Sequence, residues 1–216
     1  MNRQILILLD KTLFQPLFYA ILFILKLHKR RRQNYYPIFS GHESFLIIRP
    51  GGLGDGLMSI PLLRALRNRF PESKITLLCV KKNKVALEYL PYFNEIFAFD
   101  NLGSIHKNIF SLYRNQFDVV LDLEPFRKIS SVIAYLSGAN IRIGFDTNNR
   151  RLLYTHYVTY PNDKCYESVN MVRQLEVLGI NVPQNEAVDI RFPVVEEFLE
   201  KGRKILKLHE DYTEKL

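Results

Sequence analysis

From residue 45 onward, short apolar runs alternate with segments whose apolar residues recur at helical spacing. A short uninterrupted apolar run is typical of a strand buried on both faces, and FLIIR at 45–49 is the first of them. Between 57 and 69, Leu62, Leu63 and Leu66 leave the arginines on the opposite side, which predicts a helix. Further strands are expected at 74–80, 95–99, 118–123 and 141–145, with an edge strand at 153–160, and further helices at 83–90, 129–136, 166–180 and 194–209.

This alternation predicts an α/β fold, a doubly wound Rossmann-like domain with a mostly parallel sheet. Sheets of this kind bind ligands outside the carboxyl ends of their strands. The segment PGGLGDG at 50–56 follows the first expected strand and therefore lies at such an end. We assign residues 41–192 to this domain, 1–40 to an N-terminal helical arm and linker, and 193–216 to a helix and linker that lead away from it.

The arm combines an apolar run with a cationic end. Its apolar stretch from Leu13 to Leu25 has 13 residues, which is roughly 20 Å of helix, whereas a bilayer core needs about 30 Å. KRRR follows at 29–32, and residues 1–33 hold +6 of the net charge of +8. We therefore expect an apolar, amphipathic helix that lies on an anionic membrane surface and does not cross it. The alternative is a helix packed on the protein's own core, with its cations in water.

The distribution of charged residues, cysteines and histidines limits which partners, cellular compartment and metals the sequence suggests. A pI near 9.4 suggests nucleic-acid binding, but residues beyond 33 carry only +2, so we expect no nucleic acid. The two distant cysteines, Cys79 and Cys165, fit a reducing, cytoplasmic compartment and argue against a disulfide scaffold. The five histidines are scattered, and the acids at 122 and 124 are more typical of a buried strand end than of a metal site, so no metal is expected.

The glycine loop does not match the common nucleotide-binding motifs. No Lys-Ser/Thr follows Gly56, which excludes a P-loop, and Leu57 stands where G-x-G-x-x-G needs its third glycine. Glycines still let a bulky substrate approach the backbone, and the following helix N-terminus favours anionic groups. Asp55 has two interpretations: a cap for that helix, or a general base that takes a proton from a substrate hydroxyl.

Three segments resemble the heptosyltransferase-like enzymes of glycosyltransferase family 9. They are FLIIRPGGLGDGLMSIPLLRALRNRFPESKITLLC from residue 45, FDVVLDLEPFRKISSVIAYLSGA from 117 and IRIGFDTNNRRLLYTHYV from 141. The resemblance covers about residues 44–192. It implies one half of a B-type glycosyltransferase fold, in which the amino-terminal domain receives the acceptor and the carboxyl-terminal domain holds a nucleotide sugar, typically ADP-heptose.

The resemblance also implies roles for individual residues. Asp55 matches the family's catalytic base, and the loop residues Gly52, Leu53 and Gly54 would contact the acceptor. The usual acceptor is the inner core of lipopolysaccharide, and no metal or other cofactor is needed. An acceptor rich in phosphate and carboxylate favours cations, and four follow expected strands, although ordinary surface charge explains them equally well. These cations are Arg127, Lys128, Arg150 and Arg151.

The chain also departs from the family's pattern. Pro50-Gly51-Gly52 stands where small and hydroxyl residues are common, and residues 193–216 lead toward a donor-binding domain that the sequence does not contain. The expected function is transfer of a sugar from a nucleotide sugar to a lipid-linked saccharide, at the inner face of the cytoplasmic membrane. The alternative is a non-catalytic fragment, or a membrane-docked module for binding or assembly.

Overall fold

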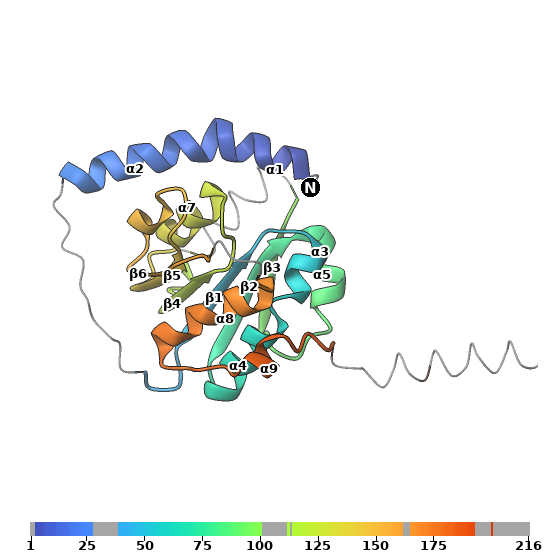
Figure 1. Cartoon of the computed structure of the whole chain (residues 1–216). Coiled ribbons are helices and arrows are strands. Elements are labelled where there is room, and N and C mark those ends of the chain that lie inside the picture. The colour runs from blue at the N-terminus through green and yellow to red at the C-terminus, as the bar shows by residue number, and fades with distance from the viewer. Residues whose placement is uncertain are drawn as a thin grey trace, which may run out of the picture.

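A computed structural model describes residues 3–27, 39–100, 112, 114–161, 165–192 and 200 of the chain. Its centre is a six-stranded sheet in the order β3-β2-β1-β4-β5-β6, and every neighbouring pair is parallel (Figure 1). This order is typical of doubly wound nucleotide-binding folds, so the predicted fold class is confirmed. The strands are β1 (Ser44–Arg49), β2 (Lys74–Val80), β3 (Glu95–Phe99), β4 (Val119–Asp122), β5 (Ile141–Phe145) and β6 (His156–Val158).

Strand β1 explains why the apolar runs are uninterrupted. Its residues alternate between two core clusters: Phe45 and Ile47 belong to one, Leu46 and Ile48 to the other. All four are fully buried, because helices cover both faces of the sheet. The expected edge strand at 153–160 is shorter than predicted, because residues 150–153 form a 3-10 turn, η2 (Arg150–Leu153), before β6 begins.

One face of the sheet is covered by α4 (Ile60–Arg69), α8 (Glu167–Val172), η3 (Arg173–Leu178) and α9 (Gln184–Ala187). The expected helix at 57–69 is two helices, α3 (Leu53–Leu57) and α4, because the Ser59 hydroxyl bonds to the Gly56 carbonyl oxygen at 2.5 Å where the chain turns between them. The predicted end at Gly179 is confirmed by its φ of 72°. The helix expected at 194–209 lies outside the described residues except for residue 200.

The other face is covered by α7 (Lys128–Leu136) and by the N-terminal arm (Figure 1). The arm consists of α1 (Arg3–Leu9), a π-helical turn η1 (Asp10–Phe14) and α2 (Gln15–Leu27). Phe14 and Phe18 are almost fully buried in the core beside α7, so one side of the arm packs on the protein itself. Residues 7–24 are also long and apolar enough, by length and composition, to cross a membrane.

Candidate functional site

The glycine loop leaves β1 at its carboxyl end and leads directly into α3, which carries Asp55 as its third residue. The Asp55 Oδ2 atom accepts a hydrogen bond from the Gly52 backbone N–H at 2.7 Å. The side chain is nevertheless 52% exposed. The carboxylate therefore caps α3 with one oxygen while about half of the side chain stays open to solvent, so the two interpretations of Asp55 are compatible with each other.

Gly51 makes room for this carboxylate. A Cβ atom at Gly51 would lie 2.4 Å from Asp55 Oδ2 and 2.9 Å from Asp55 Cβ, whereas a Cβ at Gly54 would meet nothing within 4 Å. The Gly51 carbonyl accepts a 2.7 Å hydrogen bond from the buried Asn83 side chain, which lies in α5 (Lys81–Leu87). The loop needs glycine at position 51 because the Asp55 side chain folds back over it. The hydrogen bond from Asn83 of α5 holds the Gly51 backbone in this place.

Arg49, the last residue of β1, holds the other side of Asp55. Its side chain is 3% exposed, and its Nε donates to the Asp55 carbonyl at 3.1 Å. The Nη2 atom lies 3.6 Å from Asp55 Oδ1 and 3.4 Å from Glu167 Oε1, and Nη1 donates to the Leu123 carbonyl. The guanidinium thus joins β1, α3, α8 and the loop after β4. Sequence analysis missed it, although a charged residue ending a buried strand was a signal.

Tyr160, which follows β6, contacts the second carboxylate oxygen of Glu167 and extends this chain of polar contacts. Its hydroxyl donates to Glu167 Oε2 at 2.7 Å, and its ring meets the edges of Phe126 and Phe145. Burial raises the pKa of Tyr160 to about 12, and the Glu167 carboxylate adds to the rise. The contacts run from Asp55 through Arg49 and Glu167 to Tyr160, so two carboxylates share one buried cation.

Three of the four predicted acceptor-binding cations lie partly exposed after strand ends. Arg127 pairs with the buried Glu124 in the loop after β4. Arg151 pairs with Asp146 at 3.2 Å in the loop after β5 and is 46% exposed. The Lys128 ammonium lies 5.4 and 5.5 Å from the ring centres of Phe18 and Tyr19 in the arm. Each cation has a partner within the protein, and an anionic ligand would have to compete with that partner.

Arg150 occupies a different environment. Its side chain is fully buried, and its Nη2 donates to Asp122 Oδ2 at 2.7 Å and to the Ser130 hydroxyl at 2.9 Å. The Tyr154 hydroxyl donates to the same Asp122 oxygen at 2.6 Å. Burial raises the pKa of Asp122, and the neighbouring guanidinium opposes that rise. Arg150 therefore ties the end of β4 to η2 and does not face a ligand, which argues against its predicted role.

The remaining predicted site residues form the exposed surface of the loop. Leu53 is 42% exposed, Gly54 is exposed, and the backbone N–H of Gly52 is engaged by Asp55. The acids of the 122–124 segment serve internal contacts with Arg150 and Arg127. Within the described part of the chain, no group of three or more His, Cys, Asp or Glu residues could hold a metal ion.

A scan against known protein families finds no match, and a search of curated proteins finds no relative. Solved structures do match. A glycosyltransferase of family 9 from Veillonella parvula matches with a TM-score of 0.64 and 20% identity, over 82% of this chain and 52% of its own. The E. coli heptosyltransferase WaaC, bound to ADP-2-deoxy-2-fluoro heptose, matches with a TM-score of 0.57 and 14% identity, over 65% of this chain and 50% of its own.

E. coli ADP-heptose lipopolysaccharide heptosyltransferase II matches with a TM-score of 0.56 and 20% identity, over 71% of this chain and 47% of its own. The chain thus spans about half the length of the structures it matches. Identities this low establish the fold alone. The likeness to family 9 noticed in the sequence is confirmed at that level: the chain has the Rossmann-like fold found in about half of a family 9 glycosyltransferase and of two heptosyltransferases.

Proposed function

We propose that this chain is the acceptor-side domain of a heptosyltransferase-like glycosyltransferase, with Asp55 as the general base. The observation that carries the proposal is a half-exposed carboxylate at the carboxyl end of the central strand, on a loop that glycine clears for it. In the reaction, Asp55 takes the proton of an acceptor hydroxyl. The hydroxyl oxygen bonds to the anomeric carbon, and the bond from that carbon to the diphosphate of the donor breaks.

The donor would be a nucleotide sugar such as ADP-heptose. Two of the matched structures are of a heptosyltransferase with ADP or an ADP-heptose analogue, which supports this donor class. The donor would sit on a second Rossmann-like domain facing the carboxyl edge of this sheet, on the same polypeptide or another. This domain would contribute the base and the acceptor surface, while the second would align the leaving group with the attacking oxygen.

The acceptor would be an anionic saccharide linked to a lipid, as in a lipopolysaccharide core. Arg127, Lys128 and Arg151 follow β4 and β5, on the side of the sheet where ligands bind. Phosphate or carboxylate oxygens can replace the acids that Arg127 and Arg151 now contact, because a guanidinium fork matches such oxygens. Such an acceptor, together with the cationic arm, supports a location on the inner face of the cytoplasmic membrane.

A second function is favoured by one specific contact. The hydrogen bond from Gly52 N–H to Asp55 gives that carboxylate a structural role as a helix cap. On that basis the chain would be a non-catalytic module that binds or assembles at a membrane. The two functions differ in what they require of residue 55. A general base must be able to accept a proton, whereas a helix cap needs only an oxygen that accepts a hydrogen bond.

The substitution Asp55→Asn separates them. Asparagine keeps an oxygen for Gly52 N–H but takes no proton, so sugar transfer from ADP-heptose should fall by about 10²–10⁴-fold. The assay uses the full chain together with a family 9 donor domain and a lipopolysaccharide-core acceptor. Binding of that acceptor is followed separately through backbone amide NMR shifts of the glycine loop. Full transfer by Asp55→Asn, or no shift on adding acceptor, would overturn the proposal.

Two glycines provide a matched pair for the same assay. Gly51→Ala places a methyl group against Asp55 and should reduce transfer, because the carboxylate must move. A Cβ at Gly54 would meet no protein atom within 4 Å, so Gly54→Ala should leave Asp55 in place and reduce transfer less than Gly51→Ala does. Equal loss in both variants would mean that the loop backbone, and not the position of Asp55, is what the reaction needs.

A further inference from the structure

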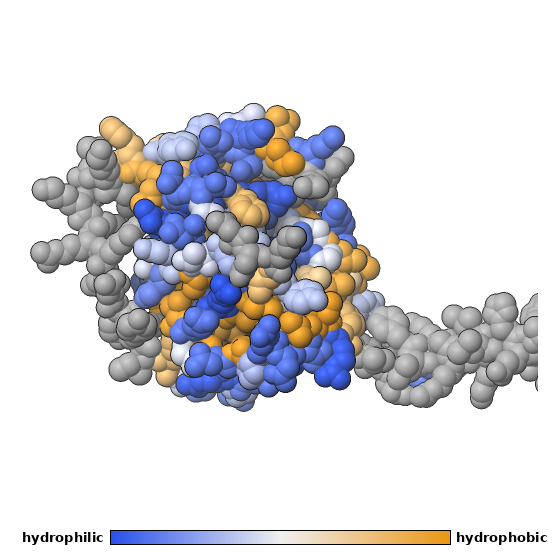
Figure 2. All heavy atoms as spheres, in the orientation of Figure 1, coloured by the Kyte–Doolittle hydropathy of each residue, from blue (hydrophilic) through white to orange (hydrophobic). Residues whose placement is uncertain are grey.

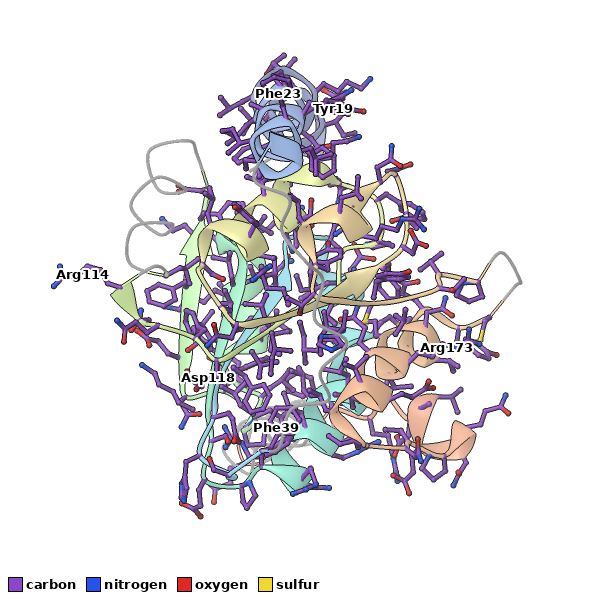
Figure 3. All side chains as sticks on the ribbon, turned by 90° about the vertical axis from the view of Figure 1, so that its left-hand side faces the viewer. Tyr19, Phe23, Phe39, Arg114, Asp118 and Arg173 are labelled. Carbon is purple, nitrogen blue, oxygen red and sulfur yellow. The ribbon has the colours of Figure 1, made fainter. Side chains whose placement is uncertain are left out.

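The N-terminal arm has two different sides. Phe14, Phe18 and Ile21 are buried against the domain, while large apolar residues are exposed on other sides of the arm between positions 7 and 24. Figure 3 looks along the arm and shows Tyr19 and Phe23 on its outer side, and Figure 2 shows hydrophobic side chains at both ends of the arm along the top of the molecule. The exposed residues are Ile7 38%, Leu8 59%, Leu13 45%, Leu17 36%, Tyr19 48%, Phe23 65% and Ile24 53%.

Charge identifies what would cover this face. Lys11 is exposed in η1, and the sequence places Lys26 and the run 29–32 at or just beyond the end of α2. Acids are scarce in the same stretch, where residues 1–33 contain only Asp10. Exposed apolar side chains on a segment whose sequence is rich in cations match an anionic lipid surface. The acyl region of the lipid would contact the apolar side chains, and the headgroups would contact the cations.

Contacts with α7 fix how the arm is held. The Asp10 carboxylate accepts a 2.6 Å hydrogen bond from the Ile129 backbone N–H, which is otherwise unsatisfied at the start of α7. Lys128 lies over the Phe18 and Tyr19 rings, about two turns further along the arm than Asp10. If the arm crossed a bilayer, Asp10 and the buried phenylalanines would leave these partners and the core would lose its cover. The packed side therefore opposes crossing, although length and composition allow it.

We propose that the arm is an in-plane membrane-binding helix, which inserts its exposed side into an anionic lipid surface while its other side stays packed on α7. This proposal rests on the membrane location in the proposed function and specifies how the chain is held there. It does not depend on sugar transfer. The contacts of Asp10, Phe18 and Tyr19 with α7, here called the clamp, also set the orientation of the domain on the membrane. The start of α7 lies at the carboxyl end of β4, next to Arg127. Arg127 and Lys128, which lie close to the arm, would then be held near the lipid surface from which a lipid-linked acceptor would enter.

Binding is tested with vesicles of phosphatidylglycerol and phosphatidylethanolamine, by co-sedimentation of the full chain. Phe23→Ser should weaken binding by about tenfold, because a mostly exposed aromatic ring is removed. Val85→Ser is the matched control: Val85 is also 65% exposed but lies in α5, and its loss should change nothing. Vesicles of phosphatidylcholine alone should bind at least about tenfold more weakly, because the cations lose their partners.

The depth of the arm in the bilayer is tested by the fluorescence of single introduced tryptophans. The natural chain contains no tryptophan, so there is no background signal. Tryptophans replacing Leu8, Leu17 and Phe23, one at a time, are quenched by lipids brominated at different depths. An in-plane arm places all three at one depth and leaves Phe18→Trp unquenched. A crossing helix places position 17 deep, positions 8 and 23 shallow, and exposes position 18. That second pattern would overturn the proposal.

Two further outcomes are decisive. Asp10→Ala removes the acceptor for Ile129 N–H and should make Phe18→Trp accessible to quenching, whereas Asp10→Asn keeps an acceptor oxygen and should not. If the chain binds no vesicle and instead sediments as a dimer that Phe23→Ser dissociates, the face is a protein interface and the proposal fails. The Asp55→Asn variant should bind vesicles normally, so failure of the catalytic assignment remains distinguishable from failure of the anchor.

Discussion

Two acid–arginine pairs lie at the carboxyl ends of the neighbouring strands β1 and β4, and they differ in burial. Asp122 and Arg150 are both fully buried and 2.7 Å apart. In the other pair Arg49 is buried, but Asp55 is half exposed, and their nearest charged atoms are 3.6 Å apart. Strand pairing places Ile48 of β1 beside Asp122, so the two pairs begin almost next to each other in the sheet.

The difference shows how one edge of a sheet can contain both a fully buried and a half-exposed carboxylate. Asp122 accepts bonds from Arg150, Tyr154 and the Glu124 backbone N–H, which leaves it no exposed surface. Asp55 follows the glycine turn beyond the end of β1, and its side chain stays half exposed. Burial gives the first pair a structural role, whereas the exposure of Asp55 is what the proposed function requires of a carboxylate that meets a substrate.

The largest expected effect comes from breaking the buried pair. Arg150→Met leaves Asp122 charged and without its cation, which should lower the free energy of unfolding by about 3–5 kcal/mol. Urea unfolding followed by circular dichroism measures the change. The double variant Asp122→Leu with Arg150→Met should be more stable than the single one, because no unpaired charge remains. A loss below about 1 kcal/mol in the single variant would show that solvent reaches the pair.

A second comparison uses the glycine beside each pair. A Cβ at Gly144 would lie 2.3 Å from the ring of Tyr154, which is buried and bonded to Asp122. Gly144→Ala should therefore destabilise the protein by about 1–3 kcal/mol, as overpacking does. Gly51→Ala presses against a half-exposed side chain that can turn away, so its cost should be smaller in the same urea experiment. The reverse order would mean that the two sites do not differ in rigidity.

Asp55→Asn should change stability by less than about 1 kcal/mol, because asparagine can replace aspartate as a helix-capping acceptor. Thermal unfolding in parallel with the transfer assay checks this. A large loss of activity with unchanged stability supports a chemical role for Asp55. Comparable losses of both would place Asp55 with Asp122 as a structural residue.

The smallest effect concerns pH. The folded-state pKa of Tyr160 is about 12, whereas an unfolded tyrosine titrates near about 10. The folded state therefore holds the phenolic proton more tightly, so this contribution to stability is complete below about pH 10 and is lost as pH rises through the folded pKa. NMR titration of ¹³C-labelled tyrosine measures it. Glu167→Gln should bring the value down, and an unchanged value would exclude Glu167 as a cause.

Sequence patterns predicted the strands, and the position of the glycine loop and Asp55 after β1, because these depend on residues close together in the chain. Arg49 and Glu167 escaped prediction as partners because they are 118 residues apart in sequence and meet only when β1 and α8 pack. Arg150 and Arg151 look alike in the sequence, but one turn of 3-10 helix buries the first and exposes the second. The arm is apolar nearly all round, so its pattern could not show which side packs on α7.

The clamp between the arm and α7 has a consequence for biosynthesis. Asp10 and its partner Ile129 are 119 residues apart, so a ribosome working at about 5–20 residues per second needs roughly 6–24 s to make the second after the first. Throughout that interval the nascent arm has no α7 to pack on, and its whole apolar circumference is available. If the arm binds the membrane as proposed, the inner leaflet would compete with chaperones for it before the domain has formed.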